Sequence, residues 1–124
     1  MKIPEGYHTI TPYFTVADAD LLIEFLAAAF GGINIVTKRY PDGKIQHARV
    51  RIGDSILMLN ESNEQYESNV SQMHLYVDDV ETVYADALSA GAESIMEPNI
   101  RPYGDPMAGV KDPCGNLWWI ATPS

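Results

Sequence analysis

The sequence has very little cysteine, few basic residues and no long apolar run. Its 124 residues contain one cysteine, so no internal disulfide can form and a reducing compartment, the cytoplasm, is expected. The best apolar stretch, residues 21–30, is interrupted by Glu24 and is too short to span a membrane. The first six residues lack the apolar core of a signal peptide. We therefore expect a single cytoplasmic domain with no membrane partner.

Basic side chains are outnumbered two to one by acidic ones. Eight Lys and Arg residues stand against 17 Asp and Glu, which gives a net charge of −9. An acidic surface repels nucleic acid and anionic membranes, so no nucleic-acid partner is expected. The same charge mildly favours cationic ligands, although it also serves plain solubility.

The turn before the last strand carries the strongest local signals. Asp112 and Pro113 suit the first two positions of a β-turn, and an aromatic and aliphatic strand follows. Cys114 lies in this turn without a basic neighbour that would activate its thiol, so we interpret it as a turn residue rather than a nucleophile. Trp118 and Trp119 are adjacent on the strand and must point to opposite faces. Both faces therefore need a partner for a large ring.

The chain is a repeat of one strand–helix–three-strand unit. Val16 corresponds to Val77 and Asp18 to Asp79, an offset of about half the chain length. Strands are predicted at residues 11–16, 34–40, 46–52 and 55–60, and again at 72–77, 93–96, 107–111 and 116–122. Helices are expected between them, beginning near Asp18 or Asp20 and at Asp79, and ending at Gly31 and Gly91. The modules are therefore residues 8–60 and 71–122, with a polar crossover linker at 61–70.

A second long connection is expected at residues 97–106, which are rich in proline. Loops of this length are often functional lids, and a passive connection is the alternative.

Alternation along the strands separates a helix-facing side from an opposite side. The apolar set faces the helices: Phe14, Val16, Ala48, Val50, Ile52, Met73, Leu75, Val77, Trp118 and Ile120. The opposite side carries a mixture of polar and aromatic residues: Thr11, Tyr13, Thr15, His47, Arg49, Arg51, Met58, Asn60, Gln72, His74, Tyr76 and Trp119. Such a mixture is typical of a binding pocket, and the wet face of an antiparallel sheet is the alternative. Large aromatic rings favour the pocket.

Four segments carry family-like motifs: residues 41–48 (PDGKIQHA), 48–55 (ARVRIGDS), 103–105 (YGD) and 112–119 (DPCGNLWW). With the repeated unit, they resemble the vicinal oxygen chelate superfamily, which includes glyoxalase I, the bleomycin-resistance proteins and extradiol dioxygenases. The resemblance is nearest to the glyoxalase-like, bleomycin-resistance-type branch. It implies an α+β fold in which two βαβββ modules form a curved mixed sheet around a cavity. It also implies a homodimer with shared cavities.

Metal-dependent members of that superfamily hold their ion through four strand residues. Carried over by resemblance, these positions are Thr11, Met58, Gln72 and Trp119, and none is a histidine or a carboxylate. Thioether and hydroxyl groups are poor ligands for the divalent metals of this chemistry, so no cofactor is expected. A two-residue shift on the fifth strand would bring in His74. The alternative is therefore a divalent metal held by the displaced set His47, Glu61 and His74.

Two histidines and two arginines on the polar side have several open roles. His47 and His74 each fit a metal ligand, a general base, a donor to a ligand, or a histidine satisfied by Tyr and Gln neighbours. Arg49 and Arg51 project together and could clamp a carboxylate or phosphate, or neutralise acidic groups of a partner subunit.

The sequence thus favours a metal-independent protein that binds a small molecule and sequesters a planar or cationic compound. The expected ligand-binding residues are Thr11, Tyr13, His47, Arg49, Met58, Gln72, His74, Tyr76, Tyr103 and Trp119. The enzyme alternative is a divalent-metal-dependent lyase, isomerase or dioxygenase. A third reading is a dimerising domain with a vestigial cavity.

Overall fold

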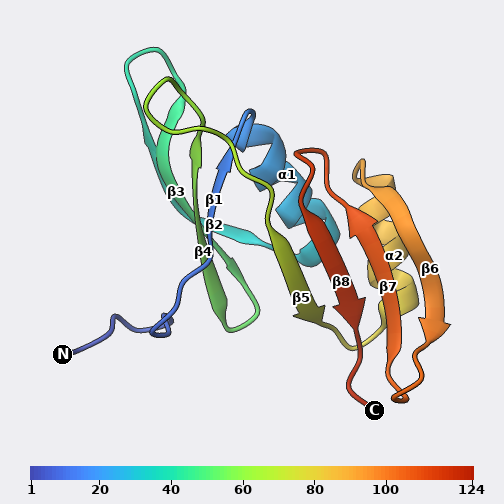
Figure 1. Cartoon of the computed structure of the whole chain (residues 1–124). Coiled ribbons are helices and arrows are strands. Elements are labelled where there is room, and N and C mark those ends of the chain that lie inside the picture. Colours follow the sequence, from blue (N-terminus) through green and yellow to red (C-terminus); the bar gives the residue numbers. More distant parts are fainter.

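The computed structural model describes all 124 residues and confirms the duplicated α+β architecture (Figure 1). The first module consists of β1 (Tyr13–Val16), α1 (Ala19–Phe30), β2 (Ile33–Arg39), β3 (Ile45–Ile52) and β4 (Ser55–Glu61). The second consists of β5 (Gln72–Tyr76), α2 (Val80–Ser89), β6 (Glu93–Ile100), β7 (Pro106–Lys111) and β8 (Leu117–Ala121). Neither helix is long and apolar enough to cross a membrane.

Each module has its own four-stranded mixed sheet. The strand orders are β1-β4-β3-β2 and β5-β8-β7-β6. In both, the first strand runs parallel to the last and the other pairs are antiparallel. The two sheets share no strand pairing, because β1 and β5 each bond only within their own module. One chain therefore presents two separate sheet faces.

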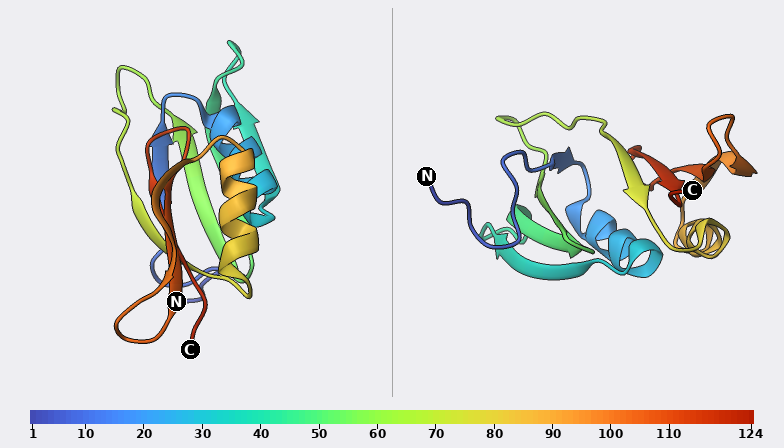
Figure 2. Two further views of the ribbon diagram at one scale, coloured as in Figure 1. Left: turned by 90° about the vertical axis from the view of Figure 1, so that its right-hand side faces the viewer. Right: turned by 90° about the horizontal axis from the view of Figure 1, so that it is seen from below.

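The modules meet through their helices. Of the helices and strands of different modules, only α1 and α2 bring their backbones into contact, and they lie side by side when the molecule is seen from below (Figure 2). The helix-facing residues form one core across this junction. The Trp118 ring stacks on Phe14 at a centroid distance of 5.9 Å and contacts Phe30 at 4.9 Å. Burying such aromatic surface stabilises the union of the two halves.

The helix boundaries follow the predicted capping residues. Asp18, rather than Asp20, caps α1 by accepting a hydrogen bond from the Leu21 backbone N–H. Gly31 ends that helix in the left-handed conformation, with φ of 68°. Asp79 caps α2 in the same way as Asp18 caps α1. The capping aspartates predicted from the sequence therefore mark where both helices begin.

The proline-rich stretch is shorter as a loop than predicted. Strand β6 continues to Ile100, so only residues 101–105 connect it to β7. Pro98 lies within the strand, where the pairing with β7 is irregular between Met96 and Asn99. Strand β6 is at the edge of its sheet, so a residue without an N–H group interrupts few ladder bonds there. The prediction of a ten-residue loop was wrong for this reason.

A buried carboxylate organises the turn before β8. The Asp112 side chain is almost fully buried and accepts hydrogen bonds from the backbone N–H groups of Cys114 and Asn116. It also accepts one from the Asn116 side-chain amide and one of 2.8 Å from the indole N–H of Trp118. The sequence predicted the turn but not this network, which ties the turn to the aromatic core.

Cys114 has the surroundings of an unreactive thiol. Burial, together with the nearby carboxylates of Asp112 and Asp18, raises its pKa to about 11. Its sulfur donates a hydrogen bond to the Asp18 backbone carbonyl. Because the thiolate is the reactive form, this environment supports the interpretation of Cys114 as a turn residue.

Candidate functional site

The sheet face of the first module that points away from α1 contains an open depression of about 590 Å³. Strand β1 contributes Tyr13 and Thr15, and β3 contributes Gln46 and His47. The remaining lining residues come from β2, the β2–β3 connection, β4 and the linker: Lys38, Tyr40, Asn60 and Tyr66. Thr15 and Asn60 are buried at its base, where the Thr15 hydroxyl donates a 2.7 Å hydrogen bond to the Asn60 side-chain oxygen. This depression is a polar, tyrosine-rich surface.

A chain of hydrogen bonds runs along this face from Tyr7 to Tyr13. The Arg49 guanidinium donates from Nε to His47 Nε2 at 3.0 Å and from a terminal nitrogen to the Tyr7 hydroxyl at 2.9 Å. His47 Nδ1 lies 3.3 Å from the Tyr13 hydroxyl. Arginine can only donate, so His47 Nε2 must accept and Nδ1 carries the proton. The Tyr13 oxygen then accepts from His47, which leaves the Tyr13 hydroxyl proton free to bond a ligand.

The surroundings of this hydrogen-bond chain keep both His47 and Tyr13 uncharged. Burial, and then the positive charges of Arg49 and Lys38, lower the pKa of His47. Burial, and then the neighbouring Tyr66 and Tyr40, raise the pKa of Tyr13. Both His47 nitrogens are occupied, so His47 has no lone pair available as a general base. The arrangement suits directional hydrogen bonding better than proton transfer.

This geometry predicts a loss of stability in mild acid. A histidine whose pKa is lowered by folding binds more protons in the unfolded state, so the free energy of unfolding decreases as the pH falls below the ordinary value of 6.5. The stability is fully present above that value, where both states are neutral. We expect His47→Gln to weaken this dependence, as measured by urea unfolding between pH 5 and pH 8. An unchanged slope in the variant would contradict the assignment.

The second sheet presents a fixed aromatic ring. The Trp119 indole lies against Gly109 of the adjacent strand, so closely that a Cβ atom at Gly109 would come within 2.4 Å of the ring. The indole N–H donates a 2.7 Å hydrogen bond to the Gln72 side-chain oxygen. The contact with Gly109 and the bond to Gln72 hold the ring in one orientation. The position of the Trp119 ring is therefore set before any ligand binds.

The other predicted ligand-binding residues divide between the two modules. Thr11 precedes β1, and Met58 pairs in register with Tyr13 on the first sheet. On β5, the His74 and Tyr76 rings lie 4.8 Å apart, edge to face, and Tyr76 is 64% exposed. Tyr103 is exposed in the 101–105 loop. The set predicted from strand alternation thus forms two surfaces in a single chain rather than one enclosed site.

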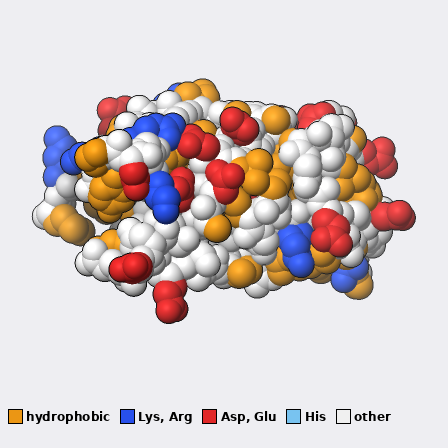
Figure 3. Space-filling view, turned by 90° about the horizontal axis from the view of Figure 1, so that it is seen from above, with side chains coloured by type: hydrophobic (Ala, Val, Ile, Leu, Met, Phe, Trp, Pro, Cys, Tyr) orange, Lys and Arg blue, Asp and Glu red, His pale blue; other side chains and the backbone are white.

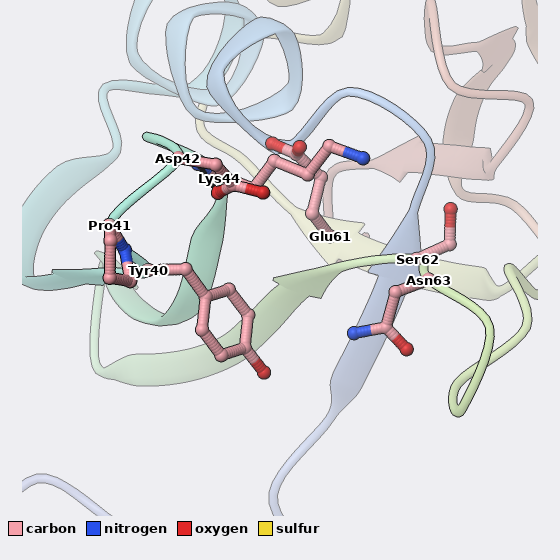
Figure 4. Close-up of a pocket in the computed structure, with 7 residues that line it drawn as sticks. All are labelled: Tyr40, Pro41, Asp42, Lys44, Glu61, Ser62 and Asn63. Atoms are coloured by element: carbon pink, nitrogen blue, oxygen red, sulfur yellow. Dashed lines mark hydrogen bonds between the residues drawn. The ribbon is translucent and has the colours of Figure 1, made fainter.

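The residues at the four family ligand positions do not fit a divalent metal. Met58 offers only a thioether, and the Gln72 oxygen is already bonded to Trp119. No three His, Cys, Asp or Glu side chains of the chain are grouped so as to hold a metal ion. In the displaced set, Glu61 lines a separate shallow pocket of about 380 Å³ with Asp42 and Lys44 (Figure 4), whereas His47 and His74 lie on different sheets.

Arg49 is also less available than the sequence suggested. Its guanidinium is engaged by His47 and Tyr7 and lies 5.6 Å above the Tyr7 ring. Two of its five N–H donors are therefore taken up by neighbours, which leaves fewer of them for a carboxylate or phosphate held together with Arg51. Acidic side chains elsewhere are dispersed, as the face in Figure 3 shows, so the net charge does not create one focused patch there.

Several lining residues were missed by the analysis of the sequence. Tyr66 lies in the linker, which has no periodicity to indicate its position. The linker runs beside β1, because the Asn69 backbone N–H donates to the Thr15 carbonyl and the Asn69 side chain accepts from the Thr15 N–H. This side-by-side arrangement brings Tyr66 to the depression. Tyr7, which is not in the lining but bonds Arg49 on the same face, was also missed because it precedes the first strand.

Comparison with known proteins identifies the relationships of this fold. The family model for the Glyoxalase/Bleomycin resistance protein/Dioxygenase superfamily matches residues 6–120. An uncharacterized protein of Mycobacterium bovis is 31% identical, with 92% of this chain and 82% of that protein covered.

Two solved structures share the fold at lower identity. TioX from Micromonospora sp. ML1 superposes with a TM-score of 0.80 at 23% identity, covering 93% of this chain and 98% of the other. Glyoxalase I from Zea mays gives 0.74 at 20% identity, covering 90% of this chain and 43% of that longer one.

Proposed function

This chain belongs to the Glyoxalase/Bleomycin resistance protein/Dioxygenase superfamily, and we propose that it is a metal-independent receptor for a small planar molecule. The observation that carries the proposal is the Trp119 ring, held in place by its contact with Gly109 and its hydrogen bond to Gln72. A ring fixed before binding loses little entropy when a ligand stacks on it. Stacking of this kind contributes about 0.5–1.5 kcal/mol beyond the burial of area.

The groups of the first sheet support a neutral ligand. Tyr13 offers a hydroxyl proton, and the His47 that positions it is held neutral by its surroundings. Arg49 and Lys38 bring positive charge to this face, which disfavours a cation, and Arg49 already donates to His47 and Tyr7. A planar, uncharged compound with one hydrogen-bond acceptor matches these groups best.

A homodimer is part of the proposal, because the two surfaces are separate in one chain. Tyr13 and Tyr76 are 45% and 64% exposed, although each lies on a sheet face with other aromatic or polar groups. If the second sheet of one copy covered the first sheet of another, Trp119 and Tyr13 would face a common enclosed site. We place this dimer in the cytoplasm, where the free Cys114 remains reduced.

Ligand titrations test the site directly. We expect neutral quinoline-type compounds to bind in isothermal calorimetry, and Trp119→Leu to weaken the affinity by about tenfold through loss of the stacking surface. Tyr13→Phe should weaken it several-fold because one hydrogen bond is lost. Tyr84→Phe is the matched control, since the Tyr84 hydroxyl bonds Ser94 outside the site and its removal should leave the affinity unchanged.

Metal analysis and sedimentation distinguish the alternatives. We expect the purified protein to contain substoichiometric metal and to keep the same ligand affinity after treatment with a chelator. Stoichiometric divalent metal, with turnover of hemithioacetals or catechols that the chelator abolishes, would establish the enzyme instead. A stable dimer that binds none of the compounds would support a dimerising domain with a vestigial cavity.

A further inference from the structure

A third cavity lies between the two modules, on the helix side of the sheets. It has a volume of about 600 Å³ and is bounded by the end of α1, the β3–β4 turn, strand β5 and helix α2. Phe30, Leu57 and Trp118 contribute apolar surface, and Val83 projects from α2. Phe30, Leu57 and Trp118 belong to the core side of the sheets, so this cleft is distinct from the face that carries Tyr13 and Trp119. Only His74 and Tyr76, at the free edge of β5, come from the opposite side of their sheet.

The charged side chains that line this cleft are all acidic. Most of its lining side chains are apolar, and Asp54 and Asp86 are the only acidic ones among them, with no Lys or Arg present. Neither carboxylate has an ion-pair partner, because the one salt bridge of the chain joins Arg39 to Asp20. Asp54 accepts a hydrogen bond only from the neighbouring Ser55 hydroxyl. Two unpaired negative groups therefore border an apolar cavity.

We propose that the inter-module cleft binds a small apolar cation, such as an ammonium ion with a hydrophobic body. Its apolar part would pack on Phe30, Leu57 and Trp118, and its charge would lie near Asp54 and Asp86. The exposed Tyr76 ring at the mouth can add a cation–π contact. An anion of the same shape would face two uncompensated carboxylates, so the site discriminates by charge as well as by size.

A pair of probes with the same apolar body tests this assignment. A phenylalkyl trimethylammonium ion is compared with the phenylalkyl carboxylate of the same length, both at pH 8. The full chain carries Trp119→Phe, which leaves Trp118 as the only tryptophan and places the signal in the cleft. We expect a saturable change of Trp118 emission with the cation and binding at least tenfold weaker with the anion. Equal affinity for the two probes would overturn the proposal.

Variants of the lining separate the cleft from the rest of the surface. Asp54→Asn and Asp86→Asn should each weaken the affinity for the cation by roughly threefold to tenfold, and neither should weaken the affinity for the anion. Asp42→Asn, on the β2–β3 hairpin outside the cleft, is the matched control and should have no effect. Unchanged cation affinity in the double Asp54→Asn, Asp86→Asn variant would overturn the proposal.

A filled cleft provides a further test. Val83→Phe places a larger side chain in the cavity and should abolish binding of the cation, with thermal unfolding used to confirm the fold. If this variant fails to fold, the exposed aspartates still decide the question. These results are independent of the sheet-face receptor, which is tested through Tyr13 and Trp119: either site can fail while the other stands.

Discussion

Replacing Asp112 with alanine is expected to lower the free energy of unfolding by about 3–5 kcal/mol. The carboxylate accepts hydrogen bonds from two backbone N–H groups, the Asn116 amide and the Trp118 indole, and all of these donors except the Cys114 N–H are fully buried. Without it these donors are buried with no partner, and each unsatisfied group costs about 1–3 kcal/mol. Domains of this size have a total stability of about 5–15 kcal/mol, so the effect is a large part of it. Urea unfolding followed by circular dichroism measures the loss.

Two further variants resolve the contributions within this network. Trp118→Phe removes the indole donor and part of the ring, while the bonds of Asp112 to the turn remain. Asp79→Ala is the matched control, because it removes an aspartate that caps α2 on the surface, where a loss of about 1 kcal/mol is expected. If Asp112→Ala costs no more than Asp79→Ala, the buried carboxylate does not organise the turn as described.

The second large effect is expected at Gly109, where alanine cannot be accommodated without moving Trp119. The new Cβ would lie 2.4 Å and 2.7 Å from two carbons of the indole ring. The ring must tilt and lose its bond to Gln72, or the strands must separate. We expect a destabilisation of about 1–3 kcal/mol, together with weaker binding of planar ligands. Calorimetric titration and urea unfolding of the same sample give both quantities.

A double-mutant cycle shows whether the ring is the cause. In the Trp119→Leu background, Gly109→Ala should cost far less, because the obstructing aromatic carbons are gone. It can even stabilise the strand, since alanine loses less backbone entropy than glycine on folding. An equal cost in both backgrounds would show that Gly109 is required for another reason and that Trp119 is not held by it.

Local patterns in the sequence were sufficient to predict the helices, most of the strands and the side of each strand that faces the core. Capping aspartates and the 3.6-residue period place α1 and α2, and alternation assigns Phe14, Val50 and Ile120 correctly to the core side. These signals depend on residues a few positions apart, which is the range over which a backbone conformation is set. The end of strand β6 was not predicted, because proline usually indicates a loop. Pro98 is tolerated in this strand because β6 lies at the edge of its sheet.

Contacts between segments that are distant in the sequence could not be predicted from these local patterns. Alternation showed that Tyr13 and Trp119 lie on the side of their strands opposite the helices, but not that the two strands belong to separate sheets. The same holds for Tyr66, which reaches the depression because the linker bonds to β1. A face is a local property of a strand, whereas a site depends on which strands meet.

The sequence by itself determined the duplicated βαβββ units, their caps and turns, and the chemistry available on each strand face. Only the tertiary structure decided that Asp112 anchors the core, that Arg49 donates to His47 and Tyr7, and that an apolar cleft bordered by two carboxylates lies beside the junction of the modules. The physical reason is the range of the interactions. Periodicity and capping act within one segment, while hydrogen-bond partners and cavities arise from side chains that only packing brings together.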